Sequence, residues 1–243
     1  MDNHADITAA ILAGGMGTRL RSAVNDRPKI LAEVNGRPFL AFLLDRLHFS
    51  GVRHTVLLTG YMGEFVEKVI GHRWEAMRIS YSHEKIRRDT GGAIRLALPY
   101  FRTPRVLVMN GDSFVPFEIK SLKDSHIANY ALISLLLTFK TDVSRYGAVT
   151  LDDKGRVVRF NEKNAAGGAG LINAGTYILN TEIIGEIPAD RPVSIEREIF
   201  PSWIGNGFYG VTTKGPFIDI GTPETYGQAC AFFEKIKHRV SAC

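Results

Sequence analysis

The chain has 243 residues, of which 45% are hydrophobic and 23% are charged, and its formal net charge is +5. This composition excludes a disordered or fibrous protein, and the length suffices to bury the core of one large α/β domain. The positive charge suits an anionic small substrate as well as nucleic acid, but no basic stretch interleaved with aromatic residues occurs. No nucleic-acid partner is therefore expected.

The sequence carries no recognisable signal for secretion or membrane insertion. Its first residues lack the basic region and the following apolar region of a secretory signal. The longest apolar stretch, residues 130–139, is interrupted by Ser134 and Thr138 and is too short to cross a bilayer. Cys230 and Cys243 are too few for a metal knuckle or a disulfide framework. A cytoplasmic protein without a membrane partner is expected.

The first predicted element is a buried strand over residues 7–13, followed by a glycine-rich loop. Three glycines belong to this loop: Gly14, Gly15 and Gly17. They allow a tight turn and a close approach of the backbone to a ligand. We expect a helix to begin near Thr18, so that backbone N–H groups point at one position, to which Arg19 and Lys29 add positive charge. The loop predicts phosphate binding, although about half of such glycine turns serve only as strand-to-helix connections.

Alternating helices and strands follow this loop. Residues 36–51 predict a packing helix with a proline in its first turn. Buried strands are predicted over 54–60 and 79–82, with a helix over 61–70 between them. We expect the apolar side of that helix to consist of Phe65, Val66, Val69 and Ile70. This alternation predicts a mostly parallel sheet covered on both faces, with ligands at the carboxyl ends of its strands.

Two segments with candidate polar residues come next. The loop over residues 83–93 leads into a helix at 94–98 and includes Glu84, Thr90 and Gly91. About half of such charged segments are solvent-exposed loops without a binding role. The strand over 106–112 ends in Asp112, where a parallel sheet would place a carboxylate for phosphate-bound magnesium. An isolated Asn-Gly-Asp string, however, is more often a turn.

From residue 118 the pattern changes to several strands. They are predicted over 131–139, 146–151, 157–161 and 172–179, with a turn at 152–155. The glycine-rich segment 165–170 is a candidate lid. Further predicted elements are a helix over 197–203, a strand over 208–213 and a last helix over 224–237, opened by Pro223. Asp219 alternates with two isoleucines on a short strand and so points to the opposite face from them.

Several strings of this chain together resemble the signature of the sugar-1-phosphate nucleotidyltransferases. They comprise residues 12–20 with 28–29, then 90–93, 110–112, 145–147, 161–163 and 173–175. Neither the dinucleotide string G-x-G-x-x-G nor the Walker string occurs. The resemblance implies an α/β fold with a Rossmann-like, mostly parallel mixed sheet flanked by helices, of the GT-A-like nucleotidyltransferase kind, with an embedded sugar-binding lobe. It implies a single domain over 1–243, divided into a nucleotide-binding part (1–117), a sugar-binding and metal part (118–222) and a C-terminal helix (223–243).

The resemblance also implies roles for individual residues. The nucleotide-binding residues would be Leu12, Ala13, Gly14, Gly15, Gly17, Thr18, Glu84, Thr90 and Gly91. The sugar-phosphate-binding residues would be Gly147, Glu162, Lys163, Asn173 and Gly175. Arg19 and Lys29 would be catalytic by neutralising the triphosphate, and Asp112 and Asp219 would hold Mg²⁺. Asp89 stands where the family usually has a glycine, which leaves the local geometry open.

The implied reaction is the attack of a sugar 1-phosphate oxygen on the α-phosphorus of a nucleoside triphosphate, with pyrophosphate leaving. Because the nucleophile is already an anion, the protein must supply positioning and charge neutralisation. GTP is favoured, since Glu84 can accept from both N1–H and the amino group of guanine. Arg87 and Arg88 are alternative readers of the O6 and N7 edge of guanine.

Within the family, the chain looks most like the D-glycero-D-manno-heptose 1-phosphate guanylyltransferases of capsule and surface-glycan pathways. Alternatives are a mannose 1-phosphate guanylyltransferase, or a glucose 1-phosphate uridylyl-, thymidylyl- or cytidylyltransferase. A different class of answer is a nucleotide-sugar-binding regulator without catalysis. The presence of Arg19, Lys29, Asp112 and Asp219 argues against a regulator. A homo-oligomer is compatible with the sequence.

Overall fold

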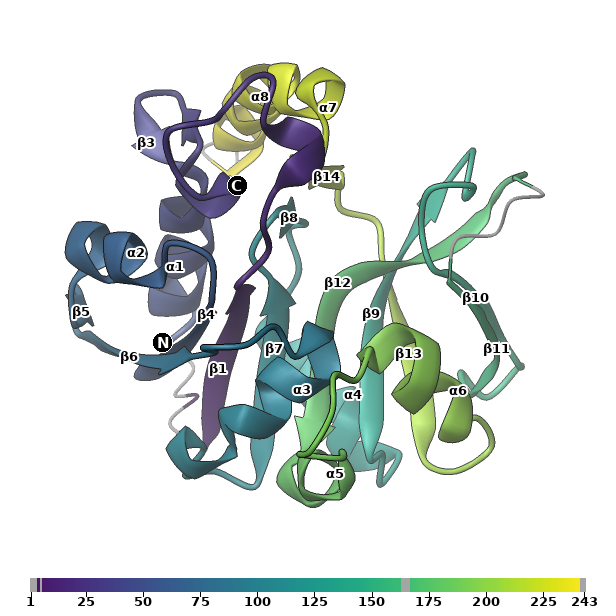
Figure 1. Ribbon diagram of the computed structural model, residues 1–243. Helices are drawn as coiled ribbons and strands as arrows, with labels where there is room; N and C mark the ends of the chain where they lie inside the picture. The colour runs from purple at the N-terminus through teal and green to yellow at the C-terminus, as the bar shows by residue number, and fades with distance from the viewer. Residues whose placement is uncertain (1–3, 5, 163–166, 241–243) are drawn as a thin grey trace.

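Ten strands of the described residues form one mixed β-sheet, with helices on both of its faces (Figure 1). The computed structural model describes residues 4, 6–162 and 167–240, with side chains up to residue 236. Eight strands follow one another across the sheet: β11 (Val157–Asn161), β10 (Ala148–Leu151), β12 (Gly170–Asn180), β7 (Arg105–Asn110), β1 (Ile7–Ala13), β4 (His54–Thr59), β6 (Met77–His83) and β5 (Arg73–Trp74). Two more strands extend from β12: β9 (Ile133–Lys140), which pairs with β12, and β13 (Phe208–Thr213), which pairs with β9. Two small ladders join β2 (Glu33–Val34) to β3 (Arg37–Pro38) and β8 (Ser113–Phe114) to β14 (Ile218–Asp219).

The centre of the sheet, formed by β7, β1, β4 and β6, is parallel, as predicted. Alternate residues of β1 enter two separate hydrophobic cores, since Ala9 and Ile11 pack in one and Ala10 packs in the other. A strand that is buried on both faces has no polar side, which explains the almost continuous apolar run of β1, in which Thr8 is the one polar residue. Because parallel strands end at one edge, the loops that follow these four strands meet there.

Helices cover both faces, and their bounds are α1 (Phe39–Phe49), α2 (Gly63–Ile70), α3 (Asp89–Leu96), α4 (Ile119–Ala128), α5 (Thr181–Glu186), α6 (Phe200–Ser202), α7 (Pro223–Gly227) and α8 (Ala229–Val240). Shorter turns are the 3₁₀ helices η1 (Thr18–Leu20), η2 (Lys29–Leu31) and η3 (Leu98–Tyr100), and the π-helix η4 (Ile195–Ile199). Phe39 of α1 and Phe233 of α8 belong to the first core. Ile94 of α3, Ile183 of α5 and Phe200 of α6 belong to the second. The layered α/β architecture is therefore the predicted one.

β12 connects the parallel and antiparallel parts of the sheet because it bends. Its first residues pair with β10, its last residues pair with β7, and its register against β9 shifts between Asn173 and Tyr177. Gly175 lies at this shift with a φ of 70°, a conformation that side chains disfavour. A Cβ atom there would lie 2.7 Å from Nδ2 of Asn110. The bend therefore places Asn173 and Gly175 beside the end of β7.

Two helix predictions are wrong in their extent. The helix expected to begin near Thr18 is η1, a single 3₁₀ turn of three residues. The last helix, expected over 224–237, is divided at Gln228 into α7 and α8, and Thr222 and Thr225 form a capping box at the start of α7. Two further helices, α4 and α5, were not predicted. Because η1 is only one turn long, the glycine loop is not followed by an α-helix whose N-terminus could bind phosphate.

The predicted apolar side of α2 is half wrong. Val66 and Ile70 are buried, together with Gly63, whereas Phe65 and Val69 are 39% and 47% exposed. Residues three and four positions apart share a helix face, so the buried face follows Gly63 and Val66, and Phe65 and Val69 lie beside it. None of the helices in the described part of the chain has the length and apolar character that a membrane crossing requires.

Candidate active site

Two adjoining cavities open at the carboxyl ends of the parallel strands. The first is lined by Leu12, Gly14, Gly15, Lys29, Ile30, Leu58, Glu84, Arg87, Asp89, Thr90, Ala93, Asn110, Gly111 and Asp112. The second is lined by Arg19, Asn110, Asp112, Ser113, Arg145, Tyr146, Gly147, Glu162, Asn173, Gly175, Glu196, Phe217 and Asp219. Asn110 and Asp112 belong to both linings. The two cavities therefore meet directly after β7.

The loop after β1 contributes Gly14 and Gly15 to the first cavity. Gly17 has a φ of 60°, in the left-handed region, and its turn leads the chain into η1. Gly17 and Thr18 belong to neither of the two linings, and Ala13 is buried in the core. The tight turn is therefore as predicted, but only part of the predicted glycine loop faces the cavity.

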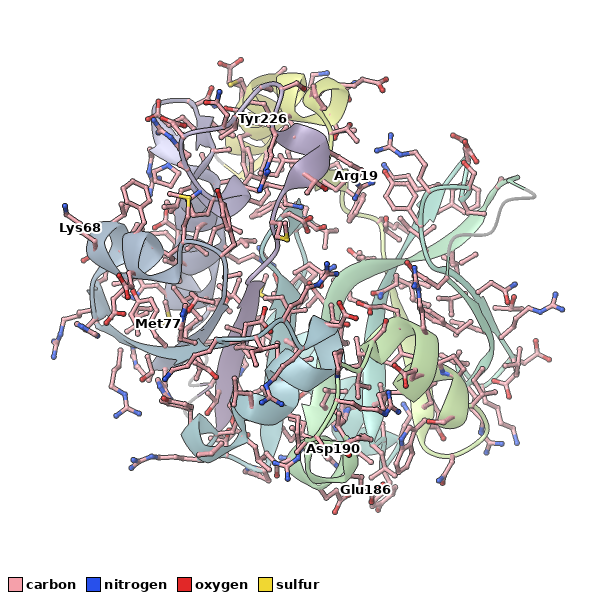
Figure 2. All side chains as sticks on the ribbon, viewed as in Figure 1. Arg19, Lys68, Met77, Glu186, Asp190 and Tyr226 are labelled. Carbon is pink, nitrogen blue, oxygen red and sulfur yellow. The ribbon has the colours of Figure 1, made fainter. Side chains whose placement is uncertain are left out.

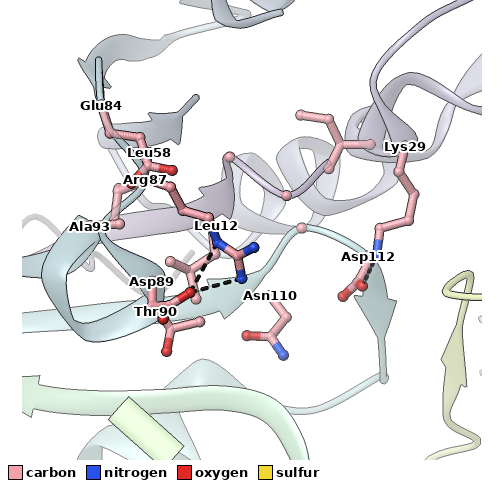
Figure 3. Close-up of a pocket in the computed structure, with 14 residues that line it drawn as sticks. Leu12, Lys29, Leu58, Glu84, Arg87, Asp89, Thr90, Ala93, Asn110 and Asp112 are labelled. Atoms are coloured by element: carbon pink, nitrogen blue, oxygen red, sulfur yellow. Dashed lines mark hydrogen bonds and ion pairs between the residues drawn. The ribbon is translucent and has the colours of Figure 1, made fainter. Parts of the chain in front are cut away.

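Glu84 lies at one end of the first cavity, and the pair of Lys29 and Asp112 lies at the other end (Figure 3). Oε2 of Glu84 accepts the backbone N–H of Arg88 at 2.9 Å. Oε1 packs against two glycines. A Cβ atom added to Gly14 would lie 2.8 Å from Oε1, and one added to Gly60 would lie 2.7 Å from it. Burial raises the pKa of Glu84, although the Arg88 N–H bond opposes this. A half-buried carboxylate therefore lies at this end of the first cavity.

Asp89 has a φ of 55°, which explains how this position accommodates a residue other than glycine. Asp is one of the few residues that enter the left-handed region at modest cost. Its carboxylate is turned toward Arg87, whose Nη2 lies 2.8 Å from Oδ1 (Figure 3). Arg87 lines the cavity, whereas the Arg88 side chain donates from Nη1 to the Ala189 carbonyl at 2.7 Å. Of the two arginines, only Arg87 faces the first cavity.

Thr90 and Gly91 lie in the first turn of α3, and their environments differ. Thr90 lines the first cavity, and its hydroxyl donates to Oε2 of Glu196 at 2.6 Å. Gly91 belongs to neither lining and donates its backbone N–H to the Val193 carbonyl at 2.8 Å. A Cβ atom at Gly91 would lie 3.0 Å from that carbonyl oxygen. Gly91 is thus required for close packing against residue 193.

Lys29 and Asp112 form an ion pair between the two cavities, with Nζ donating to Oδ2 (Figure 3). Lys29 is placed by η2, which begins directly after Pro28. Burial raises the pKa of Asp112, but the Lys29 ammonium outweighs it, so that the pKa lies below its usual value. The carboxylate is therefore ionised at neutral pH, the state in which it can bind a cation.

Asp219 is brought to Asp112 by the small ladder of β8 and β14. Asp219 pairs with Ser113, and the backbone N–H of Ile220 donates to the Asp112 carbonyl at 2.8 Å. The Tyr146 hydroxyl donates to Oδ2 of Asp219 at 2.9 Å. Both carboxylates line the second cavity, so this pair, predicted as metal ligands, is adjacent in space.

The carboxylates of Asp112 and Asp219 suit a Mg²⁺ ion that is also bound by the phosphates of a substrate. No group of three or more His, Cys, Asp or Glu side chains within the described residues could hold a metal by itself. Mg²⁺ keeps several waters and is commonly bound through one or two carboxylates together with substrate phosphates. Two adjacent carboxylates at a cavity junction are therefore sufficient for such an ion.

The remaining predicted residues fall in the second cavity or outside the described residues. Gly147, Glu162, Asn173 and Gly175 all line the second cavity. A Cβ atom at Gly147 would lie 3.0 Å from Oε2 of Glu162. Lys163, and residues 165 and 166 of the candidate lid, lie outside the described residues. The antiparallel strands and the end of β7 therefore form one polar cavity.

Arg19 lines the second cavity and not the first. It lies beside the segment that carries β14 (Figures 1 and 2). A Cβ atom at Gly221 would lie 3.5 Å from its Nη2, two residues beyond Asp219. The positive charge of Arg19 is therefore close to the pair of carboxylates.

Six residues that line the second cavity were not among the predicted site residues: Asn110, Ser113, Arg145, Tyr146, Glu196 and Phe217. Asn110 precedes Asp112 at the strand end and Tyr146 precedes Gly147, so their positions in the chain could have indicated them. Oδ1 of Asn110 is buried and has no hydrogen-bond partner within the described residues. Glu196 belongs to a segment that resembles an ordinary charged helix, so its sequence carries no signal of a site.

The sequence matches the family model described as nucleotidyl transferase over residues 8–236. The D-glycero-alpha-D-manno-heptose 1-phosphate guanylyltransferase of Aneurinibacillus thermoaerophilus is 35% identical over 222 residues, which cover 91% of this chain and 96% of that protein. The mannose-1-phosphate guanylyltransferase of Mycobacterium tuberculosis is 34% identical over 229 residues, which cover 93% of this chain and 64% of that protein. The crystal structure of HddC from Yersinia pseudotuberculosis complexed with GMP-PN is similar with a TM-score of 0.81 and 35% identity, covering 93% of this chain and 99% of that one. The family match includes every residue that lines the two cavities.

Proposed function

This chain belongs to the nucleotidyl transferase family, and we propose that it joins GTP to D-glycero-D-manno-heptose 1-phosphate, giving GDP-heptose and pyrophosphate. The observation that carries this proposal is the meeting of the two cavities at Asp112, since the reaction requires two phosphate-bearing substrates to meet at one point. Full-length similarity to a heptose 1-phosphate guanylyltransferase supports the choice of sugar. The GDP-sugar would serve capsule or surface-polysaccharide synthesis.

The first cavity is proposed to bind GTP. Glu84 would accept from N1–H and the amino group of guanine, a pair of donors that uracil, thymine and cytosine do not present together. The backbone of Gly14 and Gly15 and the ammonium of Lys29 would contact the phosphates at the opposite end. The similarity to a structure that contains GMP-PN supports a guanine nucleotide.

The second cavity is proposed to bind the sugar 1-phosphate. Glu162 and the Asn173 side chain offer groups that suit sugar hydroxyls, and Gly147 lets the backbone approach the ring. Lys163, which lies outside the described residues, is proposed to hold the sugar phosphate. Arg19 would help to neutralise the triphosphate from the side of the second cavity.

In the proposed reaction an oxygen of the sugar phosphate attacks the α-phosphorus in line and the bond to pyrophosphate breaks. The chain positions the two substrates and offsets the growing negative charge with Arg19 and Lys29. Mg²⁺ held by Asp112 and Asp219 would neutralise phosphate oxygens when bound. Both substrates are phosphorylated metabolites that do not cross membranes freely, which supports the cytoplasm as the location of the proposed reaction.

The test is a matrix of GTP, ATP, UTP, CTP and dTTP against the 1-phosphates of heptose, mannose and glucose, followed by pyrophosphate release. We expect the highest kcat/KM for GTP with D-glycero-D-manno-heptose 1-phosphate. The 34% identity to a mannose-1-phosphate guanylyltransferase makes mannose 1-phosphate the second candidate. Preference for UTP, CTP or dTTP would overturn the guanylyl assignment, and no turnover with any pair would favour a regulator.

Glu84→Gln is expected to lower kcat/KM for GTP roughly tenfold or more, because one guanine donor then faces an amide N–H. An unpaired donor in a desolvated site costs about 1 to 3 kcal/mol. The difference in kcat/KM between GTP and the other triphosphates should become smaller in the same variant. Steady-state kinetics with all five triphosphates measures both effects.

Glu64→Gln, an exposed carboxylate in the first turn of α2, is the matched control and should behave as the unchanged chain does. Arg87→Gln separates the two ways of reading the base, because Arg87 also lines the first cavity. If the Glu84 variant keeps its full GTP preference while the Arg87 variant loses it, the base is read through Arg87 and not through Glu84.

A further inference from the structure

Glu196 enters the second cavity from η4, a π-helix that packs against α3. Ser194 caps this helix, and its side-chain oxygen accepts the backbone N–H of Arg197 at 3.3 Å. π-helical turns are rare and frequently occur at functional sites. None of the roles assigned above uses Glu196.

One oxygen of Glu196 is held firmly by two hydroxyls. Oε2 accepts from Thr90 at 2.6 Å and from Ser194 at 3.0 Å. Thr90 is itself fixed, because its oxygen accepts the backbone N–H of Ile195 at 3.0 Å. No described residue donates a hydrogen bond to the other oxygen, Oε1 of Glu196. The carboxylate is thus oriented through one oxygen, while the second retains its capacity to accept.

We propose that Glu196 is a sugar-binding residue, whose Oε1 accepts hydroxyl groups of the sugar 1-phosphate. The inference rests on the proposed function, since it assigns the sugar to the second cavity. Glu162 lines the same cavity, so the ring would meet two carboxylates. A carboxylate is an acceptor only, which suits a substrate that presents several hydroxyl donors. Glu196 would therefore contribute to the choice among sugars.

The same contact links the two cavities. Thr90 lines the first cavity and its hydroxyl reaches Glu196 in the second, although the two residues are 106 positions apart in the chain. A change at Thr90 therefore alters the orientation of a group that contacts the sugar. We expect Thr90→Val to weaken use of the sugar phosphate, whereas Thr90→Ser, which keeps the hydroxyl, retains it.

The decisive variant is Glu196→Gln, which keeps the size of the side chain. Its amide oxygen can still accept from Thr90 and Ser194, and this places the amide N–H₂ where Oε1 was. We expect the KM for the sugar 1-phosphate to rise roughly tenfold, with the KM for GTP within about twofold of its original value and an unchanged Tm. Glu198→Gln is the matched control, because Glu198 lies on the same helix but pairs with Arg191.

The assay uses whichever sugar 1-phosphate the unchanged chain turns over fastest. If the unchanged chain turns over none, the proposed function fails. If it is active but Glu196→Gln leaves the sugar KM unaltered, or raises both KM values equally, the assignment of Glu196 is overturned while the proposed function stands. A lower Tm in Glu196→Gln without a change in the sugar KM would show a structural anchor and likewise overturn the inference.

Discussion

Asp112→Asn and Asp219→Asn are each expected to lower kcat by a hundredfold or more at limiting Mg²⁺. Both carboxylates line the second cavity, and Asp112 also lines the first, which places them where the two phosphates would meet. Asn keeps the shape of the side chain but loses the charge that holds the cation. Loss of a charge contact made in the transition state costs at least about 2.7 kcal/mol, which is roughly a hundredfold.

Pyrophosphate release measured across a Mg²⁺ titration tests this result, with Tm as the check on folding. Asp124→Asn is the control, since Asp124 is exposed on α4 and pairs with Lys120. Partial recovery at high Mg²⁺ is expected in both site variants, because they weaken binding of the cation. A variant that turns over at the normal rate at low Mg²⁺ does not carry a metal ligand at that position.

Lys29→Met is expected to lower kcat/KM for GTP by a hundredfold or more. Lys29 is 15% exposed and lines the first cavity, where its ammonium pairs with Asp112. In the proposed complex, Mg²⁺ would pair with Asp112, and this ammonium would contact phosphate oxygens instead. Removing a preorganised charge from a partly buried site costs about 2.7 to 4 kcal/mol of transition-state stabilisation. The expected loss is therefore similar to that of the aspartate variants.

Single-turnover measurements with saturating sugar phosphate isolate this effect on the chemical step. Arg27→Gln is the control, because Arg27 lies two residues earlier but forms surface pairs with Asp26 and Glu33. Lys29→Arg keeps the charge and should recover part of the rate. A similar loss in the Lys29 and Arg27 variants would mean that general positive charge, and not this ammonium, supports the reaction. The pKa of Asp112 should rise in Lys29→Met, because burial then acts without the ammonium.

Elements whose signals are local could be predicted from the amino-acid sequence. β1, β11 and β13 begin and end at the predicted residues, since apolar, β-branched and aromatic residues bounded by turn residues define them without reference to the rest of the chain. The turn at Gly17 and the position of Asp219 between two buried isoleucines are likewise properties of a few consecutive residues. The parallel centre of the sheet follows from the alternation of strands with helices.

Which of these residues come together in the candidate site depends on the packing of distant elements. Asp112 and Asp219 meet through β8 and β14, and Thr90 meets Glu196 across 106 positions of the chain. Contacts of this kind depend on how β12 bends at Gly175 and on how α3 packs against η4. Neither can be predicted from the periodicity of hydrophobic residues within one segment. A hydrophobic pattern specifies which face of an element is buried. It does not specify which distant side chain lies opposite, because that follows from the simultaneous packing of all elements.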